Sequence, residues 1–131
     1  MDTGTVRGTI AIRVLIAHVC GLGVSGISDT IGTTSGFSIA GAGLGLFLGG
    51  LLSVPWMIAL GVLIWFQGRT IETHPVIFAV FGPALVCGSW ALLAGGFFRE
   101  VATSSVASSL SYLLLVFGAR LLNAHREKPF Q

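Results

Sequence analysis

Apolar residues form four long runs along the chain, and short polar segments separate them. A helix of about 20 residues crosses the hydrocarbon core of a bilayer, because each residue adds roughly 1.5 Å. The runs therefore predict membrane-spanning helices at about residues 9–28, 43–66, 76–98 and 104–123. We expect residues 1–131 to form one integral membrane domain with an all-α fold, a polytopic four-transmembrane-helix bundle.

The second apolar run, residues 39–66, is longer than one upright span requires. Pro55 lies near its middle, and a proline there removes a backbone donor and crowds the preceding turn. We therefore expect one tilted or kinked helix with its bend at Pro55. A re-entrant segment within residues 30–55 is the alternative that composition leaves open.

Three polar segments connect the predicted spans. Residues 29–38 read as the longest loop, residues 67–75 as a short polar loop, and Arg99 with Glu100 as a tight turn. Asp29 is then expected just outside the first span. An aspartate there is most often a loop or helix-cap residue, and the alternative is a group at the mouth of a pore.

Composition agrees with lipid as the main solvent, since 53% of residues are hydrophobic and 9% are charged. A soluble domain usually carries about 25% charged residues, because its surface faces water. The basic residues are scattered singly or in pairs near the ends of the apolar runs. That pattern is typical of topology signals and argues against nucleic acid as a partner.

The basic residues also predict an orientation. With four spans, six of them fall on one side of the membrane: Arg7, Arg13, Arg69, Arg120, Arg126 and Lys128. Arg99 alone falls on the other side. Since the basic side normally faces the cytoplasm, both termini are predicted to be cytoplasmic (N-in/C-in). The Gly/Ala/Val-rich, Lys-poor composition suggests a bacterial inner membrane.

Small residues recur at every fourth position of the second run, at Gly41, Gly45, Gly49 and Ser53. Such a row makes a groove along one helix face, where a second helix can approach closely. Packing within the chain is the favoured interpretation, and an oligomerisation face or a pore-lining stripe is the alternative. Two weaker rows of small residues occur elsewhere: Ala17, Gly21 and Ser25, and Ala107 and Ser111.

Ionisable residues inside spans are the usual markers of function in a membrane protein. Arg13 and His18 fall in the first span, and no predicted span contains Asp or Glu. We expect Arg13 to reach the headgroups as an anchor, with an anion or substrate contact as the alternative. For His18 we expect a hydrogen bond to a neighbouring serine or carbonyl, with a single haem bond or a proton relay as alternatives.

In size and number of spans the chain resembles the small four-helix multidrug transporters. Their first helix carries a glutamate, where this chain has Ile12, Arg13 and Val14, so the resemblance is limited to architecture. No paired acid and base, Cys–His set or pair of intramembrane histidines is present. We therefore expect no enzymatic activity, no cofactor and no metal.

These observations favour a small accessory or structural subunit of a multi-subunit inner-membrane complex. It would act by helix–helix association, with other membrane subunits or copies of itself as its partners in the lipid bilayer. The alternative is a small homo-oligomeric channel, transporter or holin-like pore former.

Overall fold

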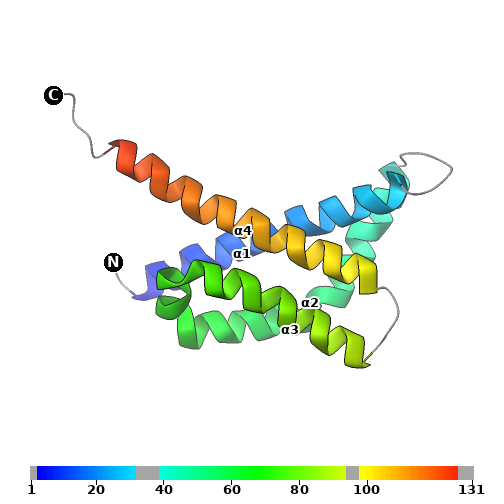
Figure 1. The fold of residues 1–131 in the computed structure, drawn as a ribbon, viewed down its shortest axis with the longest axis horizontal. Helices are drawn as coiled ribbons and strands as arrows, with labels where there is room; N and C mark the ends of the chain where they lie inside the picture. The colour runs from blue at the N-terminus through cyan, green and yellow to red at the C-terminus, as the bar shows by residue number, and fades with distance from the viewer. Residues whose placement is uncertain (1–2, 32–38, 94–97, 127–131) are drawn as a thin grey trace.

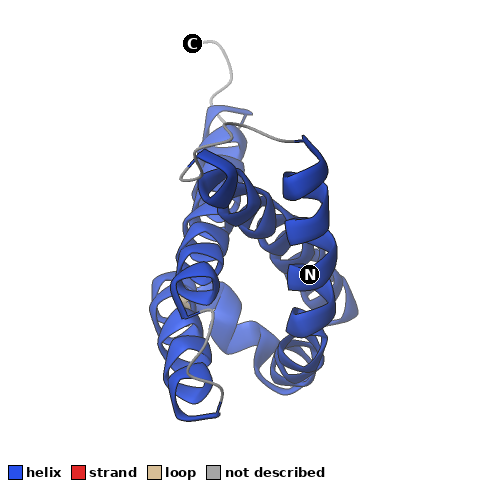
Figure 2. Cartoon of the chain, turned by 90° about the vertical axis from the view of Figure 1, so that its right-hand side faces the viewer, coloured by secondary structure: helices blue, strands red, loops and turns tan. Residues whose placement is uncertain are grey.

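The computed structural model describes residues 3–31, 39–93 and 98–126. These residues form four helices, α1 (Thr3–Ile31), α2 (Ile39–Thr73), α3 (Pro75–Leu93) and α4 (Phe98–Arg126). Within the described ranges there is no strand, as a view at right angles also shows (Figure 2). Each helix contains a stretch long and apolar enough to cross a membrane: Gly4–Ser28, Leu46–Thr73, Pro75–Leu92 and Arg99–His125. The predicted all-α fold is confirmed, and the four helices indicate a multi-pass membrane protein.

The first helix holds the bundle together. It packs along both α4 and α2, whereas α3 packs mainly against α4 and touches α2 only slightly. Figure 1 shows α4 crossing close to α1, with α2 bending along its length as it leaves the far end of α1. Displacing α1 would therefore remove most of the contacts between elements.

The buried apolar side chains come from all four helices. Helix α1 contributes one face with a spacing of three or four residues, as expected for a helix that buries one side. The full set is Val6, Ile10, Val14, Ala17, Ile64, Ile71, Ala79, Tyr112 and Val116. Phe78 of α3 meets Tyr112 of α4 edge to face, with ring centroids 5.5 Å apart, which connects α3 to this core.

The loop predicted over residues 67–75 is wrong. Helix α2 continues to Thr73, and His74 alone separates it from α3. The backbone leaves helical geometry only at Gln67, where φ is −116° and ψ is 16°. Polar side chains do not end a helix by themselves. Pro75 does start a new one, because its fixed φ suits the first turn and that turn needs no N–H donor.

Residues from the two other predicted connections are also helical. Asp29 belongs to the last turns of α1, and Arg99 and Glu100 belong to the first turn of α4, where the Glu100 carboxylate suits the helix dipole. Residues 39–55, for which a re-entrant segment was the alternative, are helical. Residues 32–38, the rest of the loop predicted over residues 29–38, lie outside the described residues.

Candidate functional site

Among the described glycines, Gly21 of α1 lies nearest to the backbone of another helix, α4. A Cβ atom added at Gly21 would lie 2.5 Å from the carbonyl oxygen of Ser104 and 2.8 Å from the backbone nitrogen of Ser108. Ala17 and Ser25 are buried one turn to either side of Gly21. The small-residue pattern of this row is weaker than that of the row in α2. Gly21 nevertheless meets backbone atoms of its neighbour, whereas Gly49 in the α2 row meets a side-chain atom.

Serine hydroxyls make this interface compatible with an apolar surrounding. Ser104 Oγ donates to the carbonyl of Val101 at 3.1 Å, and Ser108 Oγ donates to the carbonyl of Ser104 at 2.7 Å. Their polar atoms are thus satisfied within α4. Ser25 Oγ donates across the interface to the Glu100 carbonyl at 3.3 Å, which joins the end of α1 to the start of α4.

The small-residue row of α2 faces α1 in its second half. A Cβ atom at Gly49 would lie 2.9 Å from Cδ2 of Leu22, and Ser53 makes a hydrogen bond to α1. Gly41 and Gly45 lie in the first turns of α2, and for these two residues the structure describes only the helical backbone. Part of this row therefore serves packing within the chain.

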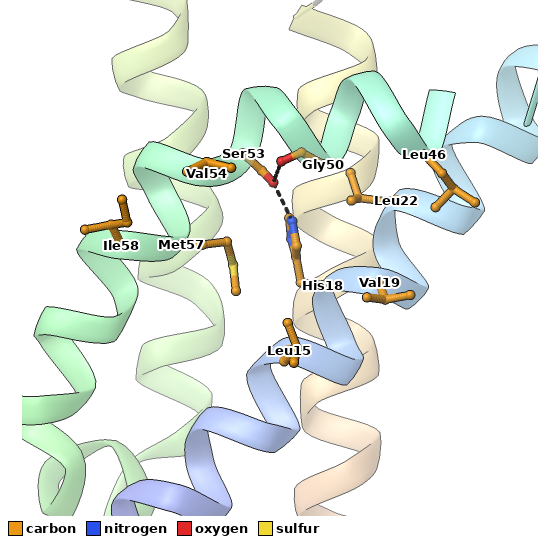
Figure 3. A pocket seen from close by; sticks show the side chains of 10 residues that line it. All are labelled: Leu15, His18, Val19, Leu22, Leu46, Gly50, Ser53, Val54, Met57 and Ile58. Carbon is orange, nitrogen blue, oxygen red and sulfur yellow. Dashed lines mark hydrogen bonds between the residues drawn. The ribbon is translucent and has the colours of Figure 1, made fainter. Parts of the chain in front are cut away.

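His18 and Ser53 point toward one another from α1 and α2 (Figure 3). The distance from His18 Nε2 to Ser53 Oγ is 2.7 Å, and Ser53 Oγ also donates to the Gly50 carbonyl at 2.8 Å. A hydroxyl has one proton, so both hydrogen bonds exist together only when Nε2 of His18 carries a proton and donates it. The expected histidine–serine contact is present, with its partner on another helix.

This pair lies in a crevice of about 520 Å³ between α1 and α2. Besides His18, Ser53 and Gly50, seven apolar side chains line the crevice, and all are labelled in Figure 3. The ribbon of α2 changes direction between Ser53 and Ile58, and Met57 extends into the gap (Figure 3). That stretch contains Pro55, where the sequence predicts a bend, and the crevice lies beside it.

Basic side chains occupy the two ends of the bundle unequally. The Arg7 guanidinium lies 4.9 Å from the ring centroid of Trp65, and Arg120 Nη2 donates to the Glu72 carbonyl at 2.9 Å. These contacts bring together the start of α1, the end of α2 and the C-terminal part of α4. Arg99 lies at the start of α4, at the opposite end.

Arg13 is not among the residues that line the crevice. Arg13 is partly buried on α1 and interacts electrostatically with Tyr112 of α4, and nothing is described of the Asp29 side chain. Within the described ranges, no group of three or more His, Cys, Asp or Glu side chains could hold a metal ion.

Comparison with known protein families, curated proteins and solved structures finds no match for this chain.

Replacing Gly21 by alanine should destabilise the α1–α4 interface, because the new methyl group meets backbone atoms that cannot rotate away. Overpacking of this kind costs about 1–3 kcal/mol. Gly23→Ala is the matched control, since a Cβ atom there meets nothing within 4 Å. We expect a lower unfolding temperature in detergent for Gly21→Ala only. Equal effects of the two variants would contradict the close approach.

The His18–Ser53 hydrogen bond should appear as a coupling energy in a double-mutant cycle of His18→Phe and Ser53→Ala. Hydrogen bonds between membrane helices average about 0.6 kcal/mol and reach about 1.7 kcal/mol. Ser89→Ala paired with His18→Phe is the control, because Ser89 Oγ bonds to the Leu85 carbonyl in its own helix. Additive unfolding free energies for both pairs would argue against the contact.

Proposed function

We propose that this chain is a small accessory or structural subunit of a multi-subunit assembly in the bacterial inner membrane. The uneven burial of its helices carries the proposal. Within the chain, 39% of the apolar stretch of α1 is buried, against 6% for α2 and 11% each for α3 and α4. About two fifths of the residues in this stretch of α1 are therefore buried within the chain, whereas few residues of the other three stretches are.

Lipid can cover exposed leucines and phenylalanines, so the small residues among them are more informative. A Cβ atom at Gly61 of α2, or at Gly82 or Gly88 of α3, would meet nothing within 4 Å. Glycine in a helix interior costs about 1 kcal/mol relative to alanine. A glycine with open space beside it leaves a notch in the helix surface. A helix from another subunit can approach closely at such a notch and pack densely.

The interior of the bundle supports association over conduction by a single chain. Its described buried side chains are apolar, apart from Ser25 and the Tyr112 hydroxyl. No continuous polar lining therefore crosses the part of the chain that the structure describes. A channel, transporter or holin-like pore, the alternative proposal, would need its conducting path between copies of the chain.

The orientation belongs to the same proposal. Arg7, Arg69 and Arg120 lie on the segments that meet at one end of the bundle, and Arg99 lies at the other. The basic end would face the cytoplasm. Both termini would then be cytoplasmic, with each of the four helices crossing the membrane once.

Single cysteines at the two ends test this orientation. In a variant with Cys20 and Cys87 replaced by alanine, Arg99→Cys should react with an impermeant maleimide added to intact spheroplasts. Thr5→Cys should react only after the membrane is opened, because it lies at the basic end. Labelling of Thr5→Cys in sealed spheroplasts would contradict the orientation.

Association is tested by native mass spectrometry after mild extraction. We expect the chain to retain a partner subunit, and Gly61→Leu and Gly88→Leu to lower the retained fraction at least tenfold, since a leucine fills each notch. Gly8→Leu is the control, because its Cβ position at the start of α1 is also open. If the chain is a monomer without a partner in every mild detergent, the proposal is contradicted. Retention of identical copies only, with ion flux in liposomes, would establish the alternative.

A further inference from the structure

One ring nitrogen of His18, a residue that lines the crevice between α1 and α2, has no hydrogen-bond partner among the described residues. Nε2 of His18 bonds to Ser53, and no described residue forms a hydrogen bond with Nδ1. Every enclosed side-chain nitrogen or oxygen among the described residues has a partner. Nδ1 is therefore accessible from outside the protein, and it belongs to a side chain that lines the crevice.

The chemical character of Nδ1 follows from the protons on its neighbours. Ser53 uses its one hydroxyl proton on the Gly50 carbonyl, so Nε2 of His18 is the donor in the second hydrogen bond. In a neutral imidazole the other nitrogen then carries a lone pair. The accessible Nδ1 is therefore a hydrogen-bond acceptor, and the group that complements it is a donor.

The position of this acceptor restricts what can satisfy it. His18 lies well inside the candidate span Gly4–Ser28, where hydrocarbon offers no donor and an unpaired polar group is costly. A bound water needs two to four polar partners, and Ser53, the other polar side chain of the described lining, already makes two hydrogen bonds. A carboxylate would need a cation, and no Lys or Arg lines the crevice.

The rest of the crevice suits a hydrocarbon group. Its walls are apolar side chains of α1 and α2, and about 520 Å³ falls within the range of roughly 300–1,000 Å³ typical of small-molecule sites. Leu15, Val19 and Ile58 line it and are also more than half exposed, so the crevice opens sideways. A molecule dissolved in the bilayer could enter without passing through water.

We propose that the crevice binds an apolar alcohol or phenol from the bilayer. The hydroxyl group of the ligand donates to Nδ1 of His18, and its hydrocarbon part lies between α1 and α2. Ser53 acts as the positioning residue, because its hydrogen bond keeps the proton of His18 on Nε2. This site does not depend on the proposed assembly role, since both walls come from one chain.

Two probes that differ only in the donor test the proposal: a long-chain alkylphenol and its methyl ether. With the full chain labelled with ¹⁵N-histidine in nanodiscs, the His18 Nδ1 resonance should shift saturably with the phenol and not with the ether. The His18→Phe variant assigns that resonance. No shift with the phenol, or equal shifts with both probes, would overturn the proposal. A quinone offers only acceptors. A shift with an alkylquinone alone would therefore mean that Nδ1 carries the proton, which would overturn both the assigned tautomer of His18 and the ligand class.

Two variants separate the hydrogen bond from the crevice itself. His18→Phe should lower the affinity for the phenol about tenfold, the value of one hydrogen bond, and leave the ether unchanged. Met57→Trp should fill the gap and weaken both probes while retaining the His18–Ser53 bond. An unchanged phenol titration in Met57→Trp would place binding elsewhere and overturn the proposal. Ser89→Ala on α3 serves as the control and should leave both probes unaffected.

Discussion

The approach of α1 and α4 at Gly21 is the contact on which the remaining arrangement depends. Helices in lipid gain little from burying apolar surface, so their association rests on dense packing and hydrogen bonds. A side chain at position 21 would meet backbone atoms of α4, and glycine removes that obstacle. Because α2 packs on α1 and α3 packs mainly on α4, a wider separation there would displace both remaining helices.

The sequence predicted the number and type of elements, but it placed several of their ends wrongly. Hydropathy reports which residues suit lipid, and a helix can continue into polar surroundings because its backbone groups stay paired. Arg69 and Glu72 therefore remain helical in α2, and Asp29 remains helical in α1. Pro75 marks the boundary between α2 and α3 better than the polar residues before it do, because the effect of a proline on the backbone does not depend on solvent.

The sequence predicted that His18 has a polar partner, but it did not predict which residue that partner is. A histidine inside a span requires a polar partner, and Ser53 belonged to a row expected to face another helix. The sequence could not pair His18 with Ser53, because their contact depends on the direction that α2 takes around Pro55. The same limit applies to Gly21. Its row looked weaker than that of α2, and only the placement of Ser104 and Ser108 shows how closely it packs.

The corner between α2 and α3 differs from an ordinary connection, because it is built from helix. After the break at Gln67 the chain stays helical to Thr73, and the His74 amide still bonds to the Thr70 carbonyl at 2.9 Å. Proteases bind their substrates as extended strands, and this corner contains no extended segment. A protease with access to this end of the molecule would have to unwind a helix before it could cut between α2 and α3.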